Sequence, residues 1–282
     1  MHGLQTLAAA SPGVQAPALG LETAPPRARA LVRLHSLDAL RGVLACVVLA
    51  DHVALTTFGS HALALAAYCA VLAFFTMSGL VLARAYDRRP LAFFVRRLVR
   101  LWPVYAVCLV AGYGLSFRLP PLSEFAWYPL PPHNGFARID PPVWTLILEA
   151  WATPVLPLLF WIAARGRVWI LLTTVTSISL VLIDERMFCL FFFAAGVSAA
   201  QFDIPWPQRL PGWSLWLGKI SYSLYLSHGL VIVIAMTMLG PVGPLLAVPS
   251  MFVVGWLVWR LVEQPSIRWS RIAGRSRVNA AV

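Results

Sequence analysis

The chain has 282 residues, of which 60% are hydrophobic and only 12% are charged, and its mean hydropathy is +0.76. Soluble domains carry about 25% charged residues, so this composition excludes an ordinary soluble enzyme and predicts an all-α, polytopic helical bundle in a lipid bilayer. The net charge of +11 does not indicate a nucleic-acid-binding protein, because the cations lie between hydrophobic stretches and not on one soluble face.

The chain divides into two tails and one membrane domain. Residues 1–34 are rich in Ala and Pro and lack a helical period, which predicts a disordered N-terminal tail. The membrane domain is expected over residues 35–265, and a basic cytoplasmic tail over residues 266–282. About eight transmembrane helices are predicted, although the fifth and sixth are short. They lie near residues 37–57, 62–83, 98–117, 142–163, 168–183, 187–202, 215–238 and 243–262.

The first predicted span carries two ionisable residues on one face. Arg41 and His52 are eleven positions apart in LDALRGVLACVVLADHVALTTF. On an α-helix, eleven steps of about 100° return to within roughly 20° of the same face and rise roughly 16 Å. We therefore expect Arg41 at the membrane boundary and His52 near the bilayer centre, where an ionisable residue is costly and is a candidate functional residue. Asp38 lies on the same face and can hold the Arg41 guanidinium.

The connection between the second and third spans, RAYDRRPLAFFVRRLVRLWPVY, is unusually basic. Two interpretations remain open for it. Basic loops commonly only set the topology, whereas Arg forks also bind phosphate groups in a bidentate manner, as a nucleotide or coenzyme A donor would require. The arginines of this segment are Arg84, Arg88, Arg89, Arg96, Arg97 and Arg100.

Two more ionisable residues are expected at the depth of His52. By helical rise, Glu149 in the fourth span lies roughly 10 Å below the outer face, and His228 in the seventh span reaches about the level of His52. A neutral imidazole at that level can act as a general base, with a carboxylate to orient it. The alternative is that these polar groups only tie helices together. Asp51 is a second carboxylate candidate, about 100° around the helix from His52.

The longest external loop is expected over about residues 118–141, RLPPLSEFAWYPLPPHNGFARIDP. Its aromatic and polar residues beside several prolines suit a semi-rigid surface that contacts a sugar or another polar acceptor. The alternative is a stiff connector with interfacial aromatic residues.

The basic residues support a topology with both termini in the cytoplasm. In an eight-span arrangement, 19 of the 22 Lys and Arg residues fall on the cytoplasmic side, which is a strong positive-inside bias. The four cysteines each lie in an apolar segment, and the chain has no CxxC pair or Cys/His cluster, so no metal site is expected. The three external exceptions are Arg118, Arg138 and Arg186.

Six segments, in order along the chain, resemble motifs of the acyltransferase-3 family of membrane acyltransferases. LDALRGVLACVVLADH is similar to the family's N-terminal motif, in which ten residues separate an Arg from a His. LGKISYSLYLSHGLV is very similar to its G-x-(I/L)-SYSLYL-x-H segment. The other four are FFTMSGLVLARAY, RRLVRLWPVY, VWTLILEAWATPVLP and VEQPSIRW.

The resemblance implies O-acylation, often O-acetylation, of an extracytoplasmic carbohydrate or lipid-linked glycan by a cytoplasmic acyl-CoA. Such an enzyme modifies cell-envelope polysaccharides from the bacterial inner membrane and needs no permanently bound cofactor. By matched position, Arg41 and His52 are the essential pair, with His52 as the base. The resemblance places Arg97 and Arg100 near the donor phosphates, and we add Arg84 and Arg96 as candidates. Glu149, Tyr222, Tyr225 and His228 match further motif positions, and we expect Glu149 and His228 in the catalytic site.

Two features depart from the family pattern. Family members commonly have more spans than the eight expected here, and Ala150 and Trp151 replace the acidic or aromatic residues that often follow the matched Glu. Two other functions therefore stay open. A transporter or flippase would use the ionisable residues as a polar route, although the sequence shows none of the inverted repeats typical of such proteins. A shortened, inactive family member would bind a partner without turnover.

Overall fold

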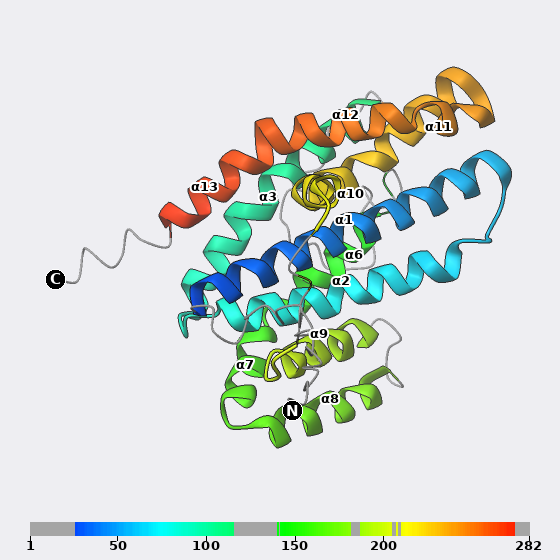
Figure 1. Ribbon diagram of the computed structural model, residues 1–282. Coiled ribbons are helices and arrows are strands. Elements are labelled where there is room, and N and C mark those ends of the chain that lie inside the picture. The colour runs from blue at the N-terminus through cyan, green and yellow to red at the C-terminus, as the bar shows by residue number, and fades with distance from the viewer. Residues whose placement is uncertain are drawn as a thin grey trace, which may run out of the picture.

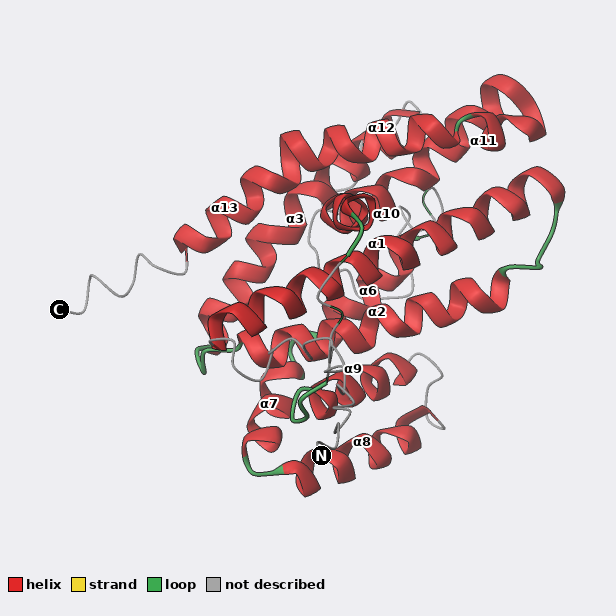
Figure 2. Cartoon of the chain, in the orientation of Figure 1, coloured by secondary structure: helices red, strands yellow, loops and turns green. Residues whose placement is uncertain are grey.

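A computed structural model describes residues 26–115, 140, 142–181, 187–204, 207 and 210–273. Within these residues every regular element is a helix and no strand occurs (Figure 2). This agrees with the predicted all-α class, because a helix satisfies its own backbone hydrogen bonds where lipid offers none. The predicted external loop at 118–141 falls almost entirely outside the described residues.

Four helices in the described part of the chain are long and apolar enough to cross a membrane. The crossing segments are His35–Phe58, Ala64–Ala85, Pro90–Leu115 and Gly212–Leu246. They belong to α1 (Pro26–Phe58), α2 (Ala64–Ala85), α3 (Pro90–Leu115) and α10 (Gly212–Leu239), which continues through η2 (Gly240–Val242) and α11 (Gly243–Leu246).

The predicted fourth span is broken. It consists of α6 (Val143–Ala152) and α7 (Leu156–Ala164), whose axes differ by 51°. Pro154 and Pro157 lie at the break and have no N–H group to continue the hydrogen-bond ladder. Counted as one span, this pair raises the number of candidate spans among the described residues to five at most.

The expected count of about eight spans is not confirmed. The predicted fifth and sixth spans are helices, α8 (Arg167–Val181) and α9 (Phe188–Ala199), but both are shorter than the roughly 20 residues that cross a hydrocarbon core. The predicted eighth span, residues 243–262, is divided among α11, α12 (Val248–Val258) and the π-helical turn η3 (Trp259–Glu263), and α13 (Gln264–Ala273) follows it. The segment α12–α13 is not among the helices that are long and apolar enough to cross a membrane.

Both ends of the membrane domain differ from the expected boundaries. Helix α1 begins at Pro26, so residues 26–34 are helical and do not belong to a disordered tail. Helix α13 occupies Gln264–Ala273, the first part of the expected basic tail. The rest of the expected tails, residues 1–25 and 274–282, lies outside the described residues.

Glycines bring two pairs of helices into backbone contact. Helices α1 and α10 run parallel, and a Cβ atom at Gly42 would lie 2.6 Å from the backbone nitrogen of Gly218. Helices α2 and α9 run antiparallel, and a Cβ atom at Gly79 or Gly196 would collide with a backbone carbonyl of the other helix. Small residues commonly allow such close approach between membrane helices.

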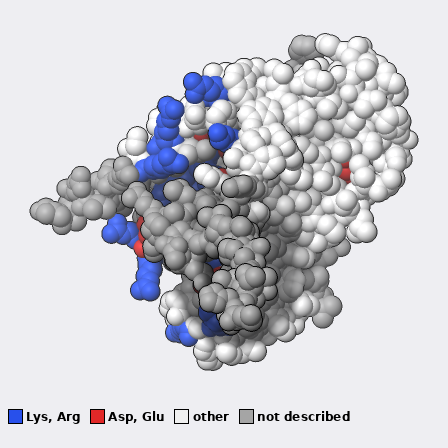
Figure 3. All heavy atoms as spheres, in the orientation of Figure 1, with Lys and Arg blue, Asp and Glu red and all other residues white. Residues whose placement is uncertain are grey.

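The bundle is apolar at its sides and basic at one end. Figure 1 shows α7, α8 and α9 grouped on one side of α2, with α12 and α13 on the opposite side of the bundle. Helix α8 exposes the large side chains of Val168, Trp169, Leu172 and Val175, as a lipid-facing helix does. In the view of Figure 3, the visible Lys and Arg side chains gather at the end where α1 begins and α13 ends.

Candidate active site

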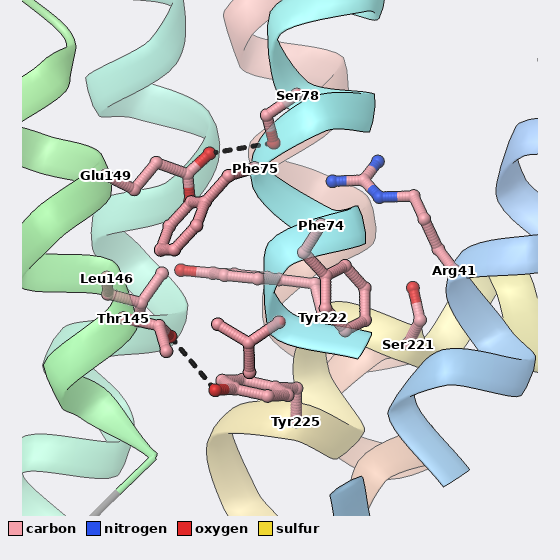
Figure 4. A pocket seen from close by; sticks show the side chains of 11 residues that line it. Arg41, Phe74, Phe75, Ser78, Thr145, Leu146, Glu149, Ser221, Tyr222 and Tyr225 are labelled. Carbon is pink, nitrogen blue, oxygen red and sulfur yellow. Dashed lines mark hydrogen bonds between the residues drawn. The ribbon is translucent and has the colours of Figure 1, made fainter. Parts of the chain in front are cut away.

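A pocket lies between α1, α2, α6 and α10 (Figure 4). Its apolar wall includes Phe74 and Phe75 of α2 and Leu146 of α6. Each of the four helices also contributes at least one polar side chain, which is the usual composition of a small-molecule site. The polar residues are Arg41, Ser78, Thr145, Glu149, Ser221, Tyr222 and Tyr225.

Glu149 is held in the pocket by two partners from different helices. The Ser78 hydroxyl of α2 donates to Glu149 Oε1 over 3.1 Å, and the Arg97 guanidinium of α3 forms an ion pair with the same oxygen. The Glu149 and Arg97 side chains are only 19% and 10% exposed, so water screens this pair weakly. Ser78, which sequence reasoning left out of the site, is therefore a functional candidate because it contacts the matched glutamate.

The expected depth of Glu149 is wrong. Helix α6 starts at the level of the histidines, because Pro142 Cδ lies 3.4 Å from the position that a Cβ atom of Gly229, the residue after His228, would occupy. Glu149 follows Pro142 by seven residues and thus lies roughly 10 Å from the histidine level, toward Arg41. It shares the pocket with Arg41 and has no hydrogen bond to His52 or His228 in the described structure.

Arg41 points into this pocket from α1 (Figure 4). It interacts electrostatically with the carboxylates of Asp38, Glu149 and Glu263 and with the Arg100 guanidinium. The contact with Asp38 agrees with their predicted common helix face. Arg41 is therefore a cation with several acidic neighbours on different helices.

Glu263 is a buried carboxylate that the sequence-based site did not include. It is 3% exposed and accepts a hydrogen bond of 2.6 Å from the Ser223 hydroxyl of α10. It ends the π-helical turn η3, and such turns are frequent at functional sites. The available signal was the VEQP segment, in which Glu263 is the acidic residue.

The structure separates the four arginines that we expected to bind the donor. Arg97 pairs with Glu149 at the pocket, and Arg100 interacts with Arg41. Arg96 instead forms a 3.0 Å ion pair with Asp87, and this hydrogen bond lowers the pKa of the Asp87 carboxyl group. Arg84 donates a 3.0 Å hydrogen bond to the Phe202 carbonyl after α9. Of the four, Arg97 thus bonds to a pocket residue, and Arg100 interacts electrostatically with the pocket residue Arg41.

His52 and His228 form a direct pair beyond the pocket, toward the C-terminal ends of α1 and α10. His52 Nδ1 lies 2.9 Å from His228 Nε2, and the planes of the two rings are 9° apart. His228 is 1% exposed. The structure therefore brings these two predicted residues together and leaves Glu149 at the other end of the site.

The hydrogen bonds of the pair determine which nitrogens carry protons. His228 Nδ1 lies 3.2 Å from the Leu224 carbonyl oxygen, which only accepts, so this nitrogen is protonated. In a neutral His228 the Nε2 atom is then an acceptor, and the Nδ1 atom of His52 is its donor. A neutral His52 consequently keeps its lone pair on Nε2, which is the form that a general base requires.

Tyr225 connects the pocket with the histidine pair. Its ring centroid lies 5.8 Å from that of His228 and also 5.8 Å from that of Phe74 in the pocket wall. Its hydroxyl group is 3.0 Å from Thr145 Oγ1, which fixes the ring between α6 and α10 (Figure 4). The arginines, the pocket and the histidines therefore follow one another along the bundle.

The family follows from a sequence comparison. The profile of an acyltransferase domain family, acyltransferase-3, matches residues 34–183, which is more than half of the chain. The chain belongs to the acyltransferase-3 family. The matched segment includes Arg41, His52, Arg97 and Glu149. Neither the comparison with curated proteins nor that with solved structures gave a match. Family membership and the apolar helices together fit a membrane acyltransferase.

Proposed function

We propose that this acyltransferase-3 protein transfers an acyl group, most simply acetyl, from acyl-CoA to a hydroxyl group of an extracytoplasmic carbohydrate or lipid-linked glycan. The observation that carries the proposal is the His52–His228 hydrogen bond, which leaves a basic nitrogen on His52 outward of an Arg-lined pocket. In this proposal the protein lies in the bacterial inner membrane with both termini in the cytoplasm, because its cations favour the cytoplasmic side.

The basic end of the pocket suits the anionic donor. Arg97 and Arg100 come from α3 and Arg41 from α1, so the phosphates of acyl-CoA would meet guanidinium groups from two helices. Glu149 forms an ion pair with Arg97 in this structure, so a donor phosphate would compete with the Glu149 carboxylate for the guanidinium group. The acyl end of the donor would then extend along α1 from Arg41 toward His52, a rise of roughly 16 Å.

The histidine pair supplies the base for direct transfer. His52 Nε2 would take the proton of the acceptor hydroxyl group while the hydroxyl oxygen attacks the thioester carbonyl carbon. The C–S bond then breaks, and the proton on His52 passes to the leaving thiolate to give an ester and free CoA. His228 would act as a positioning residue, because its Nε2 atom holds His52 in the required tautomer. This path needs no covalent acyl-enzyme intermediate.

The proposal is tested by the transfer of labelled acetyl groups from acetyl-CoA to envelope glycans in membrane vesicles. His52→Ala is expected to lower the transfer rate at least 100-fold, since general base catalysis contributes about 10²–10⁴-fold. His61→Ala is the matched control, because His61 is exposed beyond the end of α1. Full activity of His52→Ala would exclude the mechanism, and movement of acceptor without acyl transfer would instead favour a transporter.

A further inference from the structure

A fully buried carboxyl group lies at the level of the histidine pair. Asp140 is 0% exposed, and neither of its side-chain oxygens has a hydrogen-bond partner among the described residues. Its Oδ1 atom lies against Gly229, where a Cβ atom would collide with it. Gly229 directly follows His228, so Asp140 is at the level of the proposed base.

In the described structure the Asp140 carboxyl group neither caps a helix nor forms an ion pair. Helix α6 begins two residues after Pro141, yet no side chain caps its first turn. The residues that interact electrostatically with Asp140 include Cys108 and Tyr225, which are not cations. A buried carboxyl group without hydrogen bonds is costly, and such groups in native proteins call for an explanation. A ligand that supplies the missing hydrogen bonds would provide one.

A second carboxyl group flanks the pair from α1. Asp51 is next to His52 in sequence, is 8% exposed, and its Oδ1 atom likewise has no partner in the described structure. It interacts electrostatically with His52. Carboxyl groups from two different elements, each with an oxygen that has no hydrogen-bond partner in the described structure, therefore lie at about the level of the histidines.

Resting on the proposed function, we propose that Asp140, together with Asp51, binds the acceptor and selects a neutral polyhydroxyl compound. A carboxylate accepts hydrogen bonds from hydroxyl groups, and a protonated carboxyl group both donates and accepts. Asp140 would hold a hydroxyl group next to the one that His52 deprotonates. An acceptor with its own carboxylate, such as a uronic acid, would have to bury that charge beside Asp140, whose neighbours Cys108 and Tyr225 are not cations, and would be disfavoured.

The test uses the full-length protein in proteoliposomes with acetyl-CoA and two matched acceptors, methyl α-D-glucopyranoside and its 6-carboxylate, methyl α-D-glucopyranosiduronic acid. We expect the wild type to favour the neutral glucoside at least tenfold in kcat/KM. Asp140→Ala should lower kcat/KM for the glucoside at least tenfold. The KM for acetyl-CoA and the rate of thioester hydrolysis without acceptor should not change.

A conservative variant tests the hydrogen bond itself. Asp140→Asn keeps hydrogen-bonding atoms, so it should retain more glucoside activity than Asp140→Ala. Asp203→Asn, at an exposed position, is the matched control and should behave as the wild type. Monodisperse size-exclusion profiles in detergent establish that each variant is folded. If Asp140→Ala is not folded, the test rests on Asp140→Asn.

Two outcomes would overturn the inference. One is equal kcat/KM of the wild type for both acceptors, and the other is unchanged acceptor kinetics in both Asp140 variants. In either case, transfer of label to endogenous envelope glycans would leave the proposed function intact. The absence of any acyl transfer by the wild type would overturn the proposed function and the acceptor subsite together.

Discussion

His52 bonds to His228 because a glycine contact between α1 and α10 aligns the two helices. His52 follows Gly42 by ten positions on α1, and His228 follows Gly218 by ten positions on α10. The helices are parallel, so the backbone contact at the two glycines and the 2.9 Å hydrogen bond between the histidines belong to the same alignment. The glycine contact therefore positions the proposed base from roughly 15 Å away.

We expect Gly42→Val to destabilise the protein and to lower acyl transfer. A Cβ atom at this position would lie 2.6 Å from backbone atoms of Leu217 and Gly218, which forces α1 and α10 apart. Overpacking costs about 1–3 kcal/mol, and more where backbone must move. Thermal unfolding in detergent measures the change. Gly114→Val, at a helical position with no neighbour within 4 Å, should leave transfer unchanged.

Replacement of His228 should change the pH profile as well as the rate. The rate of acyl transfer is expected to fall as the pH is lowered through the titration of the histidine pair, because His52 with a protonated Nε2 atom cannot take the proton of the acceptor hydroxyl group. His228→Phe removes the acceptor for His52 Nδ1 and should lower kcat by about 10–100-fold, as the loss of supporting hydrogen bonds does elsewhere.

His228→Phe should also shift the low-pH side of the rate profile, because that side reports the coupled titration of His52 and His228. His228→Gln offers an amide oxygen to His52 Nδ1 and should recover part of kcat. An unchanged acid limb in His228→Phe would show that His228 only packs between helices.

The Arg97–Glu149 pair should show measurable coupling in stability. A double-mutant cycle with Arg97→Met and Glu149→Gln is expected to give about 1–3 kcal/mol, because both side chains are largely buried. The Arg96–Asp87 pair is the internal comparison. Its side chains are 26% and 43% exposed, and its coupling should stay below about 1 kcal/mol. Equal coupling in the two pairs would contradict a protected site around Glu149.

Arg100 should affect the donor and not the acceptor. Arg100→Met is expected to raise the KM for acetyl-CoA about tenfold or more, since a hydrogen bond to a charged group contributes about 1.5–3 kcal/mol. Added salt should raise this KM more in the wild type than in the variant, because ions screen the attraction. Arg271→Met, at an exposed position of α13, serves as the control. A rise in the acceptor KM alone would argue against a donor site here.

The site was only partly predictable, and the reason differs from residue to residue. Arg41 and His52 lie on one helix, so their spacing alone placed them on one face. The depth of Glu149 was wrong because α6 begins beside Gly229, which no local pattern reveals. Ser78 belongs to the matched FFTMSGLVLARAY segment, but its bond to Glu149 depends on the packing of a distant element. Asp140 stands in ordinary sequence surroundings, and only the structure shows that its carboxyl group has no hydrogen-bond partner among the described residues.

The sequence by itself determined the helical membrane class, the basic end and the helix face shared by Arg41 and His52, because composition and a period of 3.6 residues are local properties. Only the tertiary structure decided that His228 completes the hydrogen bonds of His52 while Glu149 pairs with Arg97. Those pairings depend on the depth at which each helix starts, on the 51° break between α6 and α7, and on glycine contacts between helices distant in sequence. Such features result from packing, which couples residues far apart in the chain.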